Sequence, residues 1–209
     1  MRTVLVLVLA ITAVCASAQV DTMWVPYRGG MDLREGVYRD FLSFRMNTPS
    51  IPQAQLRDDQ GLPVRDIRQV LSKLHYQPDS GGVQSLRMER IWGFCQNDVV
   101  YVQAGNGFYR IGLMGSLAHM VYEVNYRDWD PYLYGYGTVT RTVLMQQLIN
   151  MDNGAVLPFN ASGMHMGMEL DPTLQEEFAN IPKKQRNKDE ALFRFLRLYN
   201  ERHPLLLPQ

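Results

Sequence analysis

Residues 91–126 constrain the fold most, because they combine strand-forming runs with turn residues at regular intervals. They read IWGFCQNDVVYVQAGNGFYRIGLMGSLAHMVYEVNY. Aromatic and β-branched residues favour strands, while Gln96-Asn97-Asp98 and Gly105-Asn106-Gly107 are typical of chain reversals. The expected strands are Ile91–Cys95, Val99–Val102 and Phe108–Leu113. The pattern predicts an antiparallel meander.

A fourth run after Gly115-Ser116 alternates with a period of two. Such a period places successive side chains on opposite faces of a strand. One expected face carries Ala118, Met120, Tyr122, Val124 and Tyr126, and the other carries His119, Val121, Glu123, Asn125 and Arg127. We expect the second face to be exposed to water and the first to need a covering layer.

The chain after the meander predicts a second hairpin and two covering helices. The hairpin is expected from Leu144–Met151 and Ala155–Phe159, with the turn at Asp152-Asn153-Gly154. Asp171-Pro172 is typical of a helix start, with Leu174 and Phe178 facing inward. A last helix is expected from about Asn187, as a capping box with Glu190, to His203-Pro204. Its buried face would carry Leu192, Phe195, Leu196 and Tyr199.

The sequence therefore predicts an α+β fold: a mostly antiparallel β-meander of five or more strands over 91–159, covered by C-terminal helices at 172–180 and 188–202. Upstream, a short helix capped by Asp40 is expected. Residues 50–63 are expected to be a loop. Residues 64–75 are expected to form an amphipathic helix, with Ile67, Val70, Leu71 and Leu74 on one face.

Residues 1–18 have the pattern of a secretory signal peptide. Arg2 precedes an apolar run over 4–14, and Ala16-Ser17-Ala18 has the small-x-small pattern of a cleavage site. A retained anchor is the alternative, although the run is shorter than the roughly 20 residues of a spanning helix. Lipidation at Cys15 is disfavoured by Val14 before it. We expect three parts: 1–18, an N-terminal segment 19–63, and an α+β domain 64–209.

Charge and cysteine content narrow the function classes. The formal net charge is zero, with 21 basic and 21 acidic residues, which does not favour nucleic acid as a partner. Beyond the leader, no segment is long and apolar enough to predict a membrane span. The chain has two cysteines, and after cleavage only Cys95 would remain, which excludes an internal disulfide. Its apolar strand predicts a buried, unreactive thiol.

Three segments resemble a family of uncharacterised secreted or envelope proteins of Gram-negative bacteria. They are GVYRDFLSFRMNTPS at 36–50, IWGFCQNDVVYV at 91–102 and FLRLYNERHP at 195–204. In that family a G-[IV]-Y-x-x-[FY]-x-x-F-[RK] segment precedes a WGF hairpin, and Asp152-Asn153-Gly154 is similar to its DL-x-TG turn. Where the family has Asp-Gly, this chain has Asn97-Asp98. The resemblance implies export and this architecture, and it carries no activity or catalytic residue.

A methionine cluster surrounds one histidine at Met164-His165-Met166-Gly167-Met168. Thioether and imidazole groups select Cu(I), so Met164, His165, Met166 and Met168 are candidate metal ligands. The alternative is packing, because the three methionines would share one side of an extended segment and methionine often fills gaps in a core. Zinc is not favoured, since the four histidines are scattered and Cys95 has no partner at ligand spacing.

Residues 128–137, DWDPYLYGYG, predict a long aromatic loop. Trp129, Tyr132, Tyr134 and Tyr136 combine apolar area with a polar tip, which suits a binding surface for an envelope protein or a glycan. The alternative is that these rings fold back onto the sheet.

No motif indicates an enzyme or a cofactor. The sequence lacks a Gly-x-Ser-x-Gly elbow, a His-Glu-x-x-His helix and a glycine-rich phosphate loop. His119 and Glu123 are the acid–base pair that periodicity suggests, and about 13 Å of extended strand separates them. We expect an exported, non-enzymatic binding or structural protein, with copper binding or an unrecognised hydrolase as alternatives.

Overall fold

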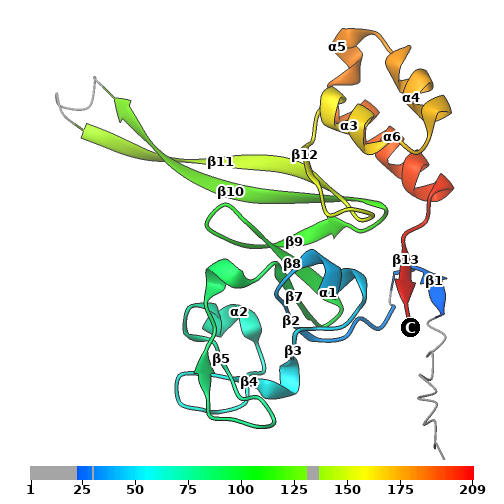
Figure 1. Ribbon diagram of the computed structural model, residues 1–209. Coiled ribbons are helices and arrows are strands. Elements are labelled where there is room, and N and C mark those ends of the chain that lie inside the picture. The colour runs from blue at the N-terminus through cyan, green and yellow to red at the C-terminus, as the bar shows by residue number, and fades with distance from the viewer. Residues whose placement is uncertain (1–22, 30, 131–136) are drawn as a thin grey trace, which may run out of the picture.

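The computed structural model describes residues 23–29, 31–130 and 137–209 (Figure 1). The strands are β1 (Trp24–Pro26), β2 (Gly36–Tyr38), β3 (Ile51–Pro52), β4 (Leu56–Arg57), β5 (His75–Tyr76), β6 (Gln84–Ser85), β7 (Gly93–Gln96), β8 (Val99–Ala104), β9 (Gly107–Leu113), β10 (Leu117–Asp130), β11 (Gly137–Asn150), β12 (Val156–Pro158) and β13 (Leu206–Pro208). The α-helices are α1 (Phe41–Arg45), α2 (Ile67–Val70), α3 (Ala161–Gly167), α4 (Pro172–Ala179), α5 (Lys183–Arg186) and α6 (Asp189–Arg202). The 3-10 turns are η1 (Gln53–Gln55), η2 (Leu71–Lys73) and η3 (Met88–Arg90).

The predicted α+β fold and antiparallel meander are confirmed. Within the described ranges, eight strands form one sheet in the order β12-β11-β10-β9-β8-β7-β2-β3. From β7 to β12 each strand pairs with the next in sequence, and all these pairs are antiparallel. The N-terminal strands β2 and β3 complete the sheet beside β7. Helices α3 to α6 lie together beyond β12 (Figure 1).

The β7–β8 hairpin closes through a two-residue turn. Gln96 pairs with Val99, and the φ angles of Asn97 and Asp98 are 50° and 58°. Asn and Asp are the non-glycine residues that best tolerate this left-handed region, and two such residues make the turn that matches the twist of paired strands. Two further bonds hold it: Asn97 N donates to Glu35, and Leu33 N donates to Asp98.

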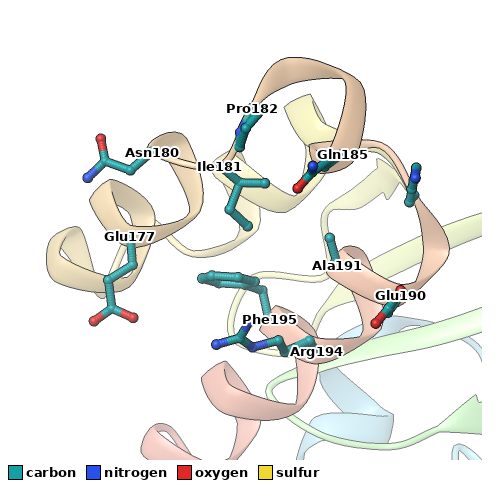
Figure 2. A pocket seen from close by; sticks show the side chains of 10 residues that line it. Glu177, Asn180, Ile181, Pro182, Gln185, Glu190, Ala191, Arg194 and Phe195 are labelled. Carbon is teal, nitrogen blue, oxygen red and sulfur yellow. The ribbon is translucent and has the colours of Figure 1, made fainter.

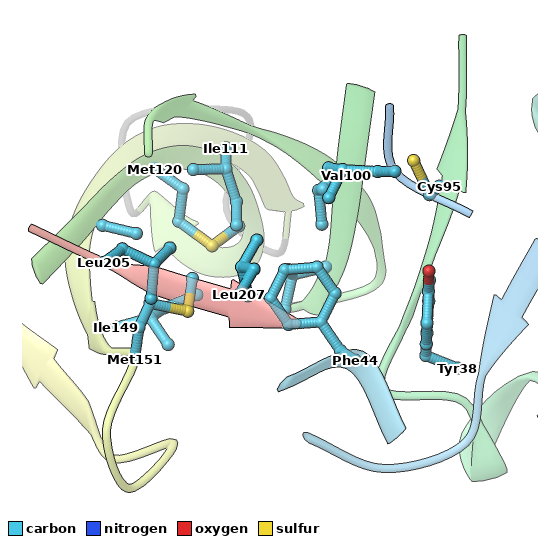
Figure 3. Close-up of a cluster of buried hydrophobic side chains, with 13 residues drawn as sticks. Tyr38, Phe44, Cys95, Val100, Ile111, Met120, Ile149, Met151, Leu205 and Leu207 are labelled. Atoms are coloured by element: carbon cyan, nitrogen blue, oxygen red, sulfur yellow. The ribbon is translucent and has the colours of Figure 1, made fainter. Parts of the chain in front are cut away.

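The sheet is buried on both faces at its centre. Adjacent residues of one strand enter different clusters: Ala118 enters the central cluster and Leu117 the helix cluster. The central cluster, shown in Figure 3, is Leu33, Tyr38, Phe44, Cys95, Val100, Val102, Ile111, Ala118, Met120, Ile149, Met151, Leu205 and Leu207. The helix cluster is Leu117, Leu148, Met164, Met168, Leu174, Phe178, Leu192, Phe195, Leu196 and Tyr199. A third cluster packs under α2 and the small β4-β5-β6 sheet.

The prediction of a water-exposed second face of β10 is wrong at His119, which is only 5% exposed. Its ring packs against Phe159 and Phe193 at centroid distances of 4.5 and 4.9 Å. The covering residues lie 40 or more positions further along the chain, so the period of β10 alone cannot reveal them. The alternation itself is correct, and Glu123 is exposed as expected.

The second hairpin is confirmed but is longer than predicted. β11 begins at Gly137 instead of Leu144, and β10 continues to Asp130, so residues 128–130 are strand and not loop. The turn after β11 is also wider than a two-residue Asn-Gly turn. Asn150 N donates to Ala155 O, and Gly154 adopts the positive φ of 76°.

The helix starts at Asp40 and Asp171 are confirmed. The Asp40 carboxylate accepts from Ser43 N, and that of Asp171 accepts from Leu174 N with Pro172 at the first position. The predicted buried face of α6 is also confirmed. The predicted capping box at Asn187 is wrong, because the helix begins after Lys188 without a side-chain cap. Asn187 Oδ1 accepts instead from the amide of Ala161, which joins α3 to α6.

The N-terminal third differs most from expectation. The helix expected over 64–75 is only one turn long, because η2 and β5 follow α2 directly and Leu74 O accepts from Leu86 N. The loop expected over 50–63 contains β3 and β4. β13 was not predicted. It pairs with β1 and places Leu207 in the central cluster (Figure 3).

Candidate functional site

The β10–β11 hairpin projects from the sheet as a two-stranded arm (Figure 1). The strands pair continuously from Leu117 with Asn150 to Asp130 with Gly137. On the outer sides, β9 pairs with β10 only at His119 and Met120, and β12 pairs with β11 only at 147–149. We call residues 121–130 and 137–146 the arm. Among the described residues, no further strand pairs with either of its edges.

The register gives the arm one mostly apolar face. Tyr122 lies opposite Met145, and Val124 lies opposite Val143. Directly paired residues share a face, and this face continues the one on which Met120 and Ile149 enter the central cluster. The apolar face comprises Tyr122, Val124, Tyr126, Val139, Val143 and Met145. Tyr126, Val143 and Met145 are 43%, 38% and 44% exposed.

The opposite face of the arm is mainly polar, with Val121, Leu144 and Trp129 as exposed exceptions. Here Asn125 lies opposite Thr142 and Arg127 opposite Thr140. Thr142 Oγ1 donates to Asn125 Oδ1 at 2.7 Å, which ties the two strands together. We call Glu123, Asn125, Arg127, Thr140 and Thr142 the polar face. The arm is therefore an amphipathic ribbon.

The base of the arm is braced and its outer part carries an ion pair. Tyr109 OH donates to Glu123 O at 3.1 Å, and the Tyr109 and Tyr122 rings lie 6.0 Å apart. Further out, Arg141 Nε lies 3.2 Å from Asp128 Oδ2 on the apolar-face side. Both side chains are about half exposed, so this pair contributes little to stability. It leaves the centre of the apolar face uncharged.

The predicted aromatic binding residues are placed only in part. Trp129 is 61% exposed at the outer end of β10, where it pairs with Thr138. Tyr132, Tyr134 and Tyr136 lie outside the described residues. The alternation in β10 predicts that Tyr122, Val124 and Tyr126 share a face that needs a covering layer. The sequence did not predict that this face stays partly exposed, or that residues 139–143 of β11 extend it.

The methionine cluster is helical, so the prediction of an extended segment is wrong. α3 turns Met164 and Met168 into the helix cluster, both fully buried, while His165 and Met166 are exposed. The structure thus does not bring Met164, His165, Met166 and Met168 to one side. His165 contributes its carbonyl, which accepts from Gln175 Nε2 at 2.6 Å. Copper binding stays a prediction, and the helix favours the packing alternative.

His119 and Cys95 are both buried groups with shifted pKa values. Burial lowers the pKa of His119, although its hydrogen bond with Gln146 Oε1 at 2.9 Å acts in the opposite direction. Burial, with the charge of Asp98, raises the pKa of the Cys95 thiol to about 12. This agrees with the predicted unreactive thiol, since the thiolate is the nucleophile.

A cavity of about 540 Å³ opens between α4, α5 and α6 (Figure 2). Ile181, Ala191 and Phe195 form its apolar part, and Phe195 is buried. Glu177 and Glu190 line it together with Lys188 and Arg194. Because charges of both signs lie around an open apolar floor, the cavity does not select one class of ligand by charge.

No group of three or more His, Cys, Asp or Glu side chains is arranged to hold a metal ion in the part of the chain that the structure covers. None of the helices within the described ranges is long and apolar enough to cross a membrane.

Comparison of the chain with protein-family models, curated proteins and solved structures finds no match. The resemblance to secreted proteins of Gram-negative bacteria stays a prediction. The candidate site therefore depends on the geometry of the arm alone.

Proposed function

We propose that the protein is an exported binding protein whose arm docks a second polypeptide chain. The single observation that carries the proposal is the apolar face of the arm, on which Tyr126, Val143 and Met145 are exposed. Val124 and Val139 on the same face are partly exposed, and Tyr122 packs against the central cluster at the base. Contiguous exposed apolar area on a surface otherwise rimmed by polar residues is typical of interaction sites. Export is supported by the leader-like pattern of residues 1–18.

A polypeptide suits the arm because its edges are open as well as its face. The outer edge of β11 over 138–145, beyond the bond from Phe159 N to Gln146 O, carries one charged side chain, Arg141. Long edges are usually protected by lysine, proline or a bulge, because unpaired N–H and C=O groups recruit other strands. A partner strand added to this edge would gain main-chain hydrogen bonds and cover apolar side chains together.

A glycan is the less suitable partner. Sugar hydroxyls need hydrogen-bonding side chains beside the aromatic rings, as ligand sites combine apolar walls with placed polar groups. The centre of the apolar face, Val124 opposite Val143, offers neither amide nor carboxylate groups. The chemistry of the arm therefore favours apolar contact with protein.

The experiment places a photo-crosslinking amino acid at Val143 on the apolar face, in the cells that produce the protein. Thr142 on the polar face is the matched control, since it is the next residue on the same strand and is also exposed. We expect a discrete adduct from Val143 and little from Thr142. An adduct of twice the chain mass would identify the partner as a second copy.

A second variant tests the open edge. Thr140→Pro removes one main-chain donor on β11, and Val143→Ser removes apolar area. For this test the photo-crosslinking amino acid is placed at Val124, which lies opposite Val143 on the apolar face. Both changes should reduce its crosslink at unchanged amounts of folded protein, because both positions are exposed. Equal adducts from both faces, or none from the apolar face, would contradict the proposal. N-terminal sequencing of the purified chain tests export separately.

A further inference from the structure

Three arginines line one cavity near the β2 end of the large sheet. Helices α3 to α6 lie at the other end, beside β12 (Figure 1). The cavity has a volume of about 450 Å³ and is lined by Arg39, Tyr76, Gln84, Ser85, Leu86, Arg87 and Arg90. It lies where β2 ends beside the β5–β6 hairpin. All three arginines are exposed, and Leu86 is buried beneath them.

The fold brings these arginines together from two distant segments. Trp92 N donates to Tyr38 O at 2.9 Å, so η3, which ends at Arg90, lies beside Arg39. Arg90 N donates to Arg87 O at 3.1 Å, which closes the η3 turn and sets the spacing of these two arginines. Main-chain bonds therefore hold all three positions.

Arg39 is also held by its side chain. Its guanidinium lies over the Tyr76 ring, 5.5 Å from the centroid, and its Nη2 donates to Tyr76 OH at 3.2 Å. Tyr76 OH in turn donates to Gln84 Oε1 at 2.5 Å. Stacking and hydrogen bonding fix the plane of the guanidinium before any ligand arrives, which reduces the entropy lost on binding.

No carboxylate balances this charge. The cavity lining contains no Asp or Glu, and none of the ion pairs between described residues involves Arg39, Arg87 or Arg90. The neighbouring Asp40 is engaged as the cap of α1, where it accepts from Ser43 N at 2.7 Å. Three like charges gathered without a counter-charge repel one another, and an anion would relieve that repulsion.

We propose that this cavity binds a terminal phosphate group, carried by a small molecule or by a lipid headgroup. Each guanidinium presents donors in a planar fork that matches phosphate oxygens. Three forks, one from the end of β2 and two from the η3 turn, suit a tetrahedral dianion better than a planar carboxylate, whose two oxygens lie in one plane. The cavity volume leaves room for the rest of a small phosphomonoester. This inference is independent of the arm.

The test measures binding by calorimetry at fixed ionic strength, with inorganic phosphate, glycerol 3-phosphate and acetate as soluble probes. Phosphatidylcholine vesicles with and without phosphatidic acid test binding to a lipid headgroup. We expect saturable binding of phosphate probes and none of acetate. Arg87→Gln and Arg90→Gln should each weaken binding about tenfold, because each removes a charge-assisted contact. Arg110→Gln, an exposed arginine on β9 outside the cavity, should change it less than twofold.

Arg87→Lys and Arg90→Lys separate charge from geometry. Both variants keep the positive charge, so the protein should stay folded. They should still bind phosphate more weakly, because lysine lacks the planar pair of donors of a guanidinium. If the protein binds only the vesicles that contain phosphatidic acid, the phosphate belongs to a lipid headgroup. If it binds glycerol 3-phosphate, the phosphate belongs to a soluble ligand. The proposal is overturned if the wild-type protein binds no phosphate probe, or if the Arg87→Gln/Arg90→Gln double variant binds as tightly as the wild type.

Discussion

Asn200 clamps the main chain of Leu117 with both ends of its amide. Its Oδ1 accepts from Leu117 N at 2.8 Å, and its Nδ2 donates to Leu117 O at 2.9 Å. These residues are 83 positions apart, at the end of α6 and the start of β10. This pair attaches the helix bundle to the base of the arm, beside the apolar contacts of the helix cluster.

Asn200→Ala should therefore destabilise the protein by about 2 kcal/mol, because it leaves two partly buried main-chain groups without partners. For a chain of this size we expect the melting temperature to fall by about 6 °C. Asn125→Ala, which removes one exposed hydrogen bond on the arm, is the matched control and should cost less than about 0.5 kcal/mol. Equal melting temperatures for the two variants would refute this role for Asn200.

Among the glycines within the described ranges, Gly163 is the one whose added Cβ atom would come closest to another atom. It lies in α3, where a Cβ atom would meet Pro158 O at 1.9 Å. Alanine normally favours a helix by about 1 kcal/mol over glycine, yet Gly163→Ala should destabilise by about 3 kcal/mol through this overlap. Denaturant unfolding measures the change. Gly82→Ala, where nothing lies within 4 Å of the added Cβ, should be nearly neutral.

The Cys95 thiol should be unreactive in the folded protein. Burial raises its pKa to about 12, so almost no thiolate forms at neutral pH. In a chain with Cys15→Ser, we expect a thiol reagent to react at least about a hundredfold more slowly than in denaturant. A Thr140→Cys variant of the same chain provides the control. Its new thiol is exposed on the arm and should react rapidly with one equivalent of the reagent. Rapid labelling of Cys95 in the native state would contradict its buried placement.

His119 should make the protein less stable in mild acid. Burial lowers its pKa in the folded state below the ordinary value of 6.5, so the unfolded chain binds the proton more readily. The free energy of unfolding should then fall as the pH drops below about 6.5 toward the folded-state pKa. Below that pKa the loss is complete.

Urea unfolding between pH 8 and pH 5 measures this effect. His119→Gln, which cannot titrate, should be less stable at pH 8 because it loses the contacts with Phe159 and Phe193. It should also show a smaller fall in stability across the range. Parallel pH profiles for wild type and variant would show that His119 does not account for the acid sensitivity.

Local sequence patterns determined much of the fold. The β7–β8 turn follows from Asn97 and Asp98, residues that tolerate positive φ, and the start of α4 follows from Asp171 before Pro172. The alternation in β10 also follows from the sequence, because a period of two is a property of the strand itself. In each case the residues that decide the structure lie within a few positions of one another.

The candidate sites were decided by tertiary structure. The same alternating pattern is buried at Met120 and exposed at Tyr126, because the sheet and the C-terminal segment cover only the base of the arm. Met164 and Met168 separate from His165 because α3 is a helix packed on Leu117. Arg39 and Arg90 line the same cavity because β2 pairs with β7, although about fifty residues separate the two arginines in the sequence. Periodicity states which side chains share a face, but which face is covered depends on contacts between segments far apart in the chain, and no local pattern contains that information.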